Sequence, residues 1–350
     1  MNIKRIGIIG LGMIATGRHI PELKNVENCK ITAICDIDEN KLKTVGDSLD
    51  IPPELRFTDY NDLINCNEVD AVEICTPNHL HIPMATAAVK AGKPLNVEKP
   101  LSIDLPNCEP LRLALQENPV ANMMSFTYRF MPAIRYAKWI IDNGVIGDIL
   151  NVDVEYLKDS GFIKGRRLEW RFEKEKAGTG VLGDLGVHLI DMAELLAGKI
   201  TAVCGVTDII VKERQRLDSD EWASVETDDY CSFICNMEND VRGNFVISRC
   251  AIGKGNSIKF DVYGTKGVIC FNMDNPTVLD VYSEIGDISN EKLKTIDVPE
   301  QFHTTQEAEF VKMLYGEDCY IFPTITDGLR SQKILDSILE SSEKHCWVQI

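Results

Sequence analysis

The sequence lacks the features that mark membrane-spanning and secreted proteins. Its apolar runs, such as Ile6 to Ile9 and Ala71 to Cys75 with its Glu73, fall far short of the roughly 20 residues that a transmembrane helix needs. Met1 leads directly into a strand pattern, without a basic start, an apolar stretch and a small-residue cleavage site. We therefore expect a cytoplasmic protein with no membrane partner.

Positive charge is also scarce, and the cysteines form no recognisable pattern. Lys and Arg number 37 against 54 Asp and Glu, which gives a net charge of −17 and disfavours nucleic acid as a partner. The twelve cysteines contain no CxxC pair and no Cys/His spacing of a zinc site. We interpret them as reduced core residues and expect no bound metal.

The length of 350 residues and the apolar content of 44% suit two domains. Strand and helix patterns alternate in the first part of the chain, which predicts a doubly wound parallel sheet, a Rossmann domain, over residues 1–126. From Asp148 onward the apolar residues recur with period two. This pattern predicts a largely antiparallel open sheet with helices on one face, within a second domain of residues 127–350 whose final helix could pack back on the first.

A glycine-rich turn follows the first predicted strand. Gly10-Leu11-Gly12-Met13-Ile14-Ala15 has the GxGxxA spacing of a dinucleotide site, in which the glycines allow a tight turn and close approach of a pyrophosphate. Asp36 ends the second predicted strand, where a carboxylate can accept hydrogen bonds from a ribose diol and would repel the extra phosphate of NADP. NAD is therefore the expected cofactor, in preference to NADP.

Two further segments end strands of the same predicted sheet. Thr76-Pro77-Asn78 follows the strand at 71–75, and Glu98-Lys99-Pro100 follows the strand at 95–97. Ligands of parallel sheets bind beyond the carboxyl ends of the strands, so both turns should face the dinucleotide. Lys99 could hold a substrate hydroxyl and favour its alkoxide form, although most lysines are simply solvated.

The segment 183–191 places polar residues inside an apolar helical pattern. Asp184 and His188 are four residues apart, so on a helix the carboxylate can orient an imidazole that accepts a proton near neutral pH. A buried histidine satisfied by a local carboxylate explains the same pair, and a metal site that includes Asp191 is a third interpretation. Later in the chain, Thr304 and Glu307 have the spacing of a capping box for a helix through Tyr315.

These motifs, in this order, resemble the family of glucose–fructose oxidoreductase, inositol dehydrogenase and the rhizopine catabolism proteins, which are NAD(P)-dependent sugar and polyol dehydrogenases. The resemblance implies Lys99, Asp184 and His188 as the catalytic residues, and adds Tyr128 to them as a substrate contact. The cofactor contacts that it implies are Gly10, Gly12, Met13, Ile14, Asp36, Thr76, Pro77, Asn78, His81, Glu98, Lys99, Arg129, Trp170 and Arg171.

The expected function is oxidation of a sugar or polyol hydroxyl by hydride transfer to NAD. Two alternatives stay open: an NAD-dependent glycosidase on the same scaffold, and a non-catalytic sugar or nucleotide sensor. A sensor is expected to lose the lysine or the histidine, and this chain keeps both Lys99 and His188. The resemblance also implies a homodimer or homotetramer formed through the second domain's sheet. Which hydroxyl is oxidised is not encoded by any single motif.

Overall fold

The computed structural model describes residues 3–284 and 292–350. The chain divides into two compact units, each built from two segments. Unit 1 comprises residues 1–125 and 305–329, and unit 2 comprises residues 126–304 and 330–350. Across the described residues, every helix is too short or too polar to cross a bilayer. All twelve cysteines are free thiols.

Unit 1 is built on a six-stranded sheet in which every strand pairs in parallel, in the order β3-β2-β1-β4-β5-β6. This confirms the predicted Rossmann sheet. The strands are β1 (Lys4–Ile9), β2 (Cys29–Cys35), β3 (Arg56–Phe57), β4 (Ala71–Ile74), β5 (Leu95–Val97) and β6 (Asn122–Met124). The central strands β1 and β4 are almost entirely buried, as expected of a sheet covered on both faces.

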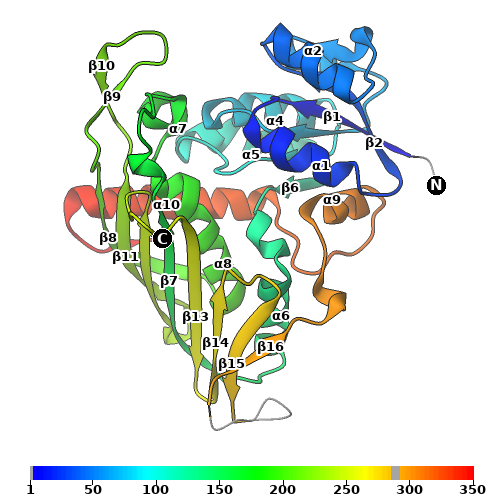
Figure 1. The fold of residues 1–350 in the computed structure, drawn as a ribbon. Helices are drawn as coiled ribbons and strands as arrows, with labels where there is room; N and C mark the ends of the chain where they lie inside the picture. The colour runs from blue at the N-terminus through cyan, green and yellow to red at the C-terminus, as the bar shows by residue number, and fades with distance from the viewer. Residues whose placement is uncertain (1–2, 285–291) are drawn as a thin grey trace. The chain divides into compact units, whose positions relative to one another are not determined.

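Helices connect these strands. They are the π-helical turn η1 (Ala15–His19), α1 (Ile20–Leu23), α2 (Glu39–Ser48), α3 (Tyr60–Asn65), α4 (His81–Lys90) and α5 (Glu109–Glu117). The chain returns to unit 1 with α9 (Gln306–Leu314), shown in orange against the dark blue α1 in Figure 1. The N-cap of α9 is Thr305, whose side chain accepts the Ala308 N–H, so the predicted capping box of Thr304 and Glu307 is wrong. Glu307 is instead completely buried.

Unit 2 is built on a nine-stranded sheet with the order β16-β15-β14-β13-β7-β12-β11-β8-β17. Only β7 and β12 pair in parallel among these strands, so the predicted, largely antiparallel sheet is confirmed. The strands are β7 (Ile149–Lys158), β8 (Ile200–Asp208), β11 (Tyr230–Met237), β12 (Arg242–Ser248), β13 (Asn256–Gly264), β14 (Gly267–Asn272), β15 (Val278–Ser283), β16 (Lys294–Asp297) and β17 (Val348–Gln349).

One face of this sheet carries the core of unit 2. Val152, Val154 and Tyr156 of β7 alternate with more exposed residues, and all three are buried. The helix α8 (Val187–Ala197) contacts β7, and α6 (Pro132–Asp142) contacts β14 and β15. Figure 1 shows both helices lying along the sheet. The remaining elements are α7 (Lys174–Ala177), the hairpin β9 (Glu213–Gln215) and β10 (Trp222–Ser224), and α10 (Ile325–Lys344), which crosses from unit 1 into unit 2.

Candidate active site

The glycine-rich turn of unit 1 brings the backbone after β1 against the end of β4. Gly10 has φ of +91°, and a Cβ there would lie 2.9 Å from the carbonyl group of Cys75. Any other residue would therefore be strained and would clash. A Cβ on Gly12, in contrast, would meet nothing within 4 Å. The loop thus leaves open space beside its backbone, which fits the approach of a pyrophosphate.

Two apolar side chains follow this turn and are turned toward solvent. Met13 is 82% exposed and Ile14 is 38% exposed, although both stand between a buried strand and a helix. Exposed apolar side chains beside an open glycine turn provide apolar surface that a bound dinucleotide would cover. Their position is compatible with the cofactor contacts that we predict for them.

Asp36 lies just beyond β2, beside the glycine-rich turn. Its Oδ2 accepts the backbone N–H of Leu11 at 2.7 Å, and its Oδ1 accepts the N–H of Asp38 at 2.9 Å. The ammonium of Lys41 lies 3.7 Å from the same Oδ2. The carboxylate therefore fixes the conformation of the turn, and its remaining lone pairs can still receive a ribose diol.

The turn after β4 is tied to the turn after β5 through His81. Nε2 of the buried His81 ring lies 2.8 Å from the carbonyl oxygen of Thr76, and Nδ1 lies 2.8 Å from that of Pro100. Burial lowers the pKa of this imidazole. His81 thus contacts backbone with both nitrogens, and Asn78, 8% exposed, starts the short helix η3 (Asn78–Leu80) beside it.

Lys99 is the second residue after β5 and is half-buried. Its backbone N–H donates to Oε2 of Glu98 at 3.1 Å, while Oε1 of Glu98 lies 3.0 Å from Nε2 of His19. His19 is 1% exposed and carries no motif, so the sequence analysis missed it. Its only signal is a polar residue on the buried face of the helix that follows the glycine-rich turn.

In unit 2, Asp184 lies in the π-helical turn η8 (Leu182–Gly186), and His188 lies in the first turn of α8. Such turns recur at functional sites because they break the regular helical register. His188 is 6% exposed, whereas Asp184 is partly accessible between buried neighbours. The segment therefore buries its apolar residues and leaves a carboxylate accessible near the imidazole.

Two tyrosines complete this region of unit 2. The ring of Tyr128, in the short helix η5 (Thr127–Phe130), lies 4.4 Å from the His188 ring between centroids. The hydroxyl groups of Tyr128 and Tyr156 are 2.7 Å apart. Burial, the neighbouring Tyr128 and the charge of Asp184 all raise the pKa of Tyr156, which therefore stays protonated. Tyr156 was not predicted as a site residue, because it fits the buried alternation of β7.

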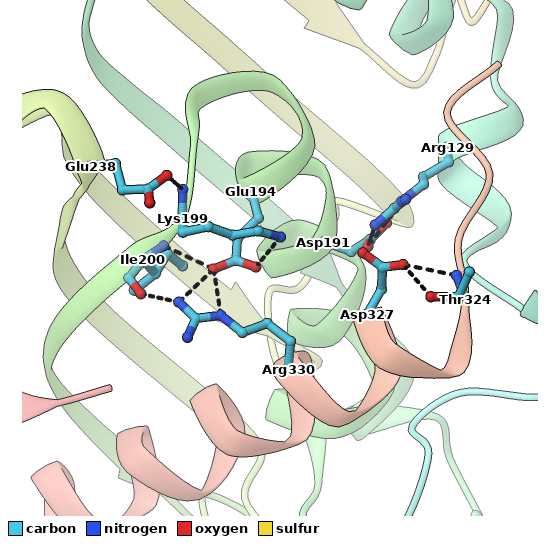
Figure 2. Close-up of polar contacts among 9 residues, drawn as sticks. All are labelled: Arg129, Asp191, Glu194, Lys199, Ile200, Glu238, Thr324, Asp327 and Arg330. Carbon is cyan, nitrogen blue, oxygen red and sulfur yellow. Dashed lines mark hydrogen bonds and ion pairs between the residues drawn. The ribbon is translucent and has the colours of Figure 1, made fainter. Parts of the chain in front are cut away.

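Asp191 is paired with Arg129, as Figure 2 shows. Nε of Arg129 lies 2.8 Å from Oδ2 of Asp191, and Nη2 lies 2.6 Å from Oδ1. Both side chains are buried, at 6% and 3% exposure. This two-pronged ion pair gives Asp191 a partner and links η5 to α8. Among the described residues, the one group whose ligand atoms converge enough for a metal is His19, Glu73 and Cys75, and Asp191 is not part of it.

A second polar cluster in Figure 2 holds the end of α8. Oε1 of Glu194 accepts the N–H of Ile200 at 2.8 Å, and Arg330 of α10 donates to the same oxygen at 3.1 Å. Lys199 lies 3.1 Å from the other oxygen. These contacts fix α8 within unit 2. They give the buried carboxylate of Glu194 a structural role, and we assign it no part in catalysis.

The two remaining predicted cofactor contacts lie in the short helix η7 (Trp170–Phe172) of unit 2. The guanidinium of Arg171 lies 4.4 Å from the ring centre of Trp170, and its backbone carbonyl accepts the hydroxyl of Thr227. Both side chains are partly exposed, so they can contact a ligand. Their role as cofactor contacts stays a prediction.

Comparisons with known proteins agree with this architecture. Residues 4–126 match the model of the oxidoreductase family with the NAD-binding Rossmann fold, and residues 134–270 match the GFO/IDH/MocA C-terminal domain. Levoglucosan dehydrogenase of Pseudarthrobacter phenanthrenivorans is 30% identical, over 84% of this chain and 83% of its own. Glucose-6-phosphate 3-dehydrogenase of Bacillus subtilis is 27% identical, over 97% of this chain and 96% of its own.

Solved structures show the same fold. A levoglucosan dehydrogenase in complex with NADH and L-sorbose superimposes with a TM-score of 0.91 at 27% identity, covering 100% of this chain and 99% of that one. The likeness thus extends over both units and over the complete order of elements.

Proposed function

We propose that this chain, a member of the glucose–fructose oxidoreductase, inositol dehydrogenase and MocA family, is a dehydrogenase. It would oxidise a hydroxyl of a sugar or polyol with NAD as the hydride acceptor. The observation that carries the proposal is the grouping of His188 with Asp184, Tyr128 and Tyr156 in unit 2. A proton acceptor beside hydroxyl-bearing side chains and a carboxylate suits a polyhydroxylated substrate.

The residues of unit 1 fit NAD. Gly10 and Gly12 would leave room for the pyrophosphate, Asp36 would receive the adenine-side ribose, and the turn from Thr76 to Asn78 would face the nicotinamide side. Met13 and Ile14 would cover the dinucleotide, and Trp170, Arg171 and Arg129 are proposed as contacts from unit 2. Asp36 favours NAD over NADP, because the negative charge of its carboxylate would repel the phosphate that NADP carries on this ribose.

In the proposed mechanism, His188 removes the proton from the hydroxyl that is oxidised. Asp184 supports the imidazolium that forms, and Lys99 stabilises negative charge on the substrate oxygen. Tyr128 positions the substrate through its hydroxyl, which Tyr156 orients at 2.7 Å. Bound NAD would supply the acceptor for the hydride of the same carbon.

The proposed substrates are inositols, aldoses and anhydro sugars, because relatives are named for myo-inositol, glucose 6-phosphate and levoglucosan. The test follows NADH formation at 340 nm across inositols, aldoses, uronates and anhydro sugars, with NADP as the control cofactor. The proposal expects net NADH with at least one class. Cleavage of a glycoside without net NADH would favour the glycosidase, and NADH binding without any turnover would favour a sensor.

We propose cytoplasmic location and self-association as further properties. Twelve free thiols suit a reducing compartment. On the sheet face of unit 2 opposite the buried core, Val206 is 53% exposed and Ile234 is 49% exposed. A second copy could cover these residues, giving a homodimer or homotetramer. Light scattering of the purified protein, compared with an I234E variant, tests this.

A further inference from the structure

Unit 1 buries four ionisable side chains that have no part in the mechanism above. His19 comes from η1, Glu73 from β4, Glu98 from the end of β5 and Glu307 from α9. Their exposures are 1%, 0%, 5% and 0%. Burying a charge costs several kcal/mol unless it is paired, so a cluster of this kind calls for an explanation in structure or function.

Both nitrogens of His19 face carboxyl oxygens. Nε2 lies 3.0 Å from Oε1 of Glu98, and Nδ1 lies 2.8 Å from Oε1 of Glu307 and 3.2 Å from Oε2 of Glu73. A neutral imidazole has one N–H donor and one acceptor, whereas the imidazolium has two donors. Carboxyl groups on opposite sides of the ring therefore favour the protonated form.

The charges of the neighbours agree with this assignment. Burial opposes protonation of His19, but the acidic groups of Cys75, Glu307 and Glu73 raise its pKa well above the usual value. Burial and the charge of Glu73 raise the pKa of Glu307 to about 8, so near neutral pH this carboxyl keeps its proton. Burial also opposes ionisation of Glu98, but its hydrogen bond from His19 lowers its pKa.

The two sides of the imidazolium thus have different partners. On the Nδ1 side, Glu307 and Glu73 form a carboxyl pair that shares a proton. On the Nε2 side stands the single ionised carboxylate of Glu98, whose other oxygen accepts the backbone N–H of Lys99 at 3.1 Å. One unbroken chain of hydrogen bonds therefore leads from the helix after the glycine-rich turn to the residue that stabilises the substrate oxygen.

We propose that His19 is a positioning residue for Lys99: its imidazolium holds the Glu98 carboxylate, and that carboxylate holds the backbone of Lys99 at the carboxyl end of β5. The inference rests on the proposed function, in which Lys99 acts on the substrate. It gives His19 a role in turnover without contact to substrate or cofactor, and it assigns that role to Nε2 alone.

The test compares H19Q with H19N. A glutamine amide nitrogen can replace the Nε2 donor, and an asparagine amide nitrogen can replace the Nδ1 donor, while both variants lose the charge. We expect H19N to lose kcat by about 10- to 100-fold, with KM for NAD changed less than about threefold, because a misplaced catalytic group costs rate more than binding. H19Q should rescue most of that rate.

The E307Q variant is the control for disturbance of the cluster. A glutamine amide has the shape of the protonated carboxyl of Glu307, is neutral like it, and offers both an acceptor toward Nδ1 of His19 and a donor toward Glu73, so kcat should stay within about twofold of the wild type. Should H19N fail to fold, E98Q interrupts the same chain at its second link. It should lower kcat by about 10-fold or more.

A second readout does not depend on activity. Hydrogen exchange of the peptide that contains residues 95–101 reports the Lys99 amide, which Glu98 protects. Exchange should be faster in H19N than in H19Q. This result would stand even if no sugar were oxidised, and a K99M variant with full activity would overturn the role proposed for Lys99 while leaving the structural link intact.

Three outcomes would overturn the inference. Equal kcat in H19N and H19Q would show that the nitrogen facing Glu98 has no special role. A wild-type rate in E98Q would break the chain at its second link. Stoichiometric zinc in the purified protein, lost in H19N, would mean that His19, Glu73 and Cys75 bind a metal in place of the imidazolium described here.

Discussion

The two units bury charge beneath a candidate catalytic side chain in different ways. In unit 2, the guanidinium of Arg129 meets the carboxylate of Asp191 in a two-pronged pair, with contacts of 2.6 and 2.8 Å. In unit 1, the imidazolium of His19 stands among three carboxyl groups, one of which keeps its proton. In the first arrangement the guanidinium keeps its charge, since an arginine stays protonated throughout the accessible pH range. The second depends on pH.

This difference separates what each unit contributes to the proposed chemistry. The fixed pair holds η5 against α8, and with it the contact of Tyr128 and His188. The titratable cluster holds the end of β5, so the support of Lys99 depends on the protonation of its neighbours. The pH dependence of stability should therefore come largely from unit 1.

The largest effect is expected from His188, since the comparison gives unit 2 the proton acceptor. H188N should lower kcat/KM by about 10²- to 10⁴-fold, the usual contribution of a placed general base, and leave NADH affinity unchanged. Steady-state rates and a fluorescence titration with NADH measure the two quantities. The matched control is H345N, the same replacement at an exposed position of unit 2. Near-normal turnover in H188N would remove the proton acceptor from unit 2.

The next largest effect is expected on stability, from breaking the ion pair of Arg129 and Asp191. D191N leaves the Arg129 guanidinium buried beside a neutral amide, which we expect to lower the free energy of unfolding by about 3–5 kcal/mol. Urea denaturation measures the loss at pH 6 and pH 8, and the size should be the same at both. The control E340Q removes one carboxylate of an exposed pair with Lys344 and should change little. A pH-dependent loss in D191N would contradict the contrast between the units.

The E307Q variant should reveal how the titratable cluster makes stability depend on pH. Because the pKa of Glu307 is raised to about 8, folding takes up a proton above about pH 4.5, where the unfolded chain is ionised. This group alone makes the wild type less stable as pH rises, by up to about 1.4 kcal/mol per pH unit, until about pH 8.

Glutamine cannot ionise. The free energy of unfolding of E307Q should therefore increase relative to that of the wild type as pH rises from 5 to 8, and the difference should stay constant at higher pH. Thermal or urea unfolding at several pH values gives the difference. E317Q, at an exposed acid of the same unit, should follow the wild type. A constant difference between E307Q and the wild type would mean that Glu307 is ionised in the folded protein.

The smallest effect concerns the cofactor. D36N keeps an acceptor for the N–H of Leu11 but removes the charge that would repel a ribose phosphate. The ratio of kcat/KM for NAD to that for NADP should fall about 10- to 100-fold, which corresponds to about 1–3 kcal/mol for a charged hydrogen-bonding group. D38N, at the N-cap of α2, is the control. An unchanged ratio would place the discrimination elsewhere, with Lys41 the nearest candidate.

The sequence predicts the backbone of unit 1 well because its features are local. A few neighbouring residues in the sequence are enough to indicate each of them: the positive φ at Gly10, the acid at the end of β2 and the lysine after β5. Both sheets follow from the alternation of apolar residues, which the structure confirms. Asp184 and His188 are also found in one short segment, although the π-helical turn between them is not.

The buried charge network could not be predicted, because its members come from distant parts of the chain. His19 and Glu307 are separated by 288 positions, and the local spacing of Glu307 with Thr304 indicated a helix cap. Tyr156 looks like an ordinary core residue of β7, and Asp191 finds Arg129 across 62 positions. A partner that arrives through tertiary packing leaves no periodic or neighbouring signal.

The central claim is that a substrate carbon gives its hydride to the nicotinamide. The most direct test supplies the best substrate of the panel with deuterium on the carbon that is oxidised, together with NAD, and examines the reduced cofactor by NMR. The account predicts deuterium at C4 of the nicotinamide in amounts equal to the keto product, and a rate of transfer that falls in H188N as kcat/KM does. Turnover that leaves the cofactor without deuterium would contradict it.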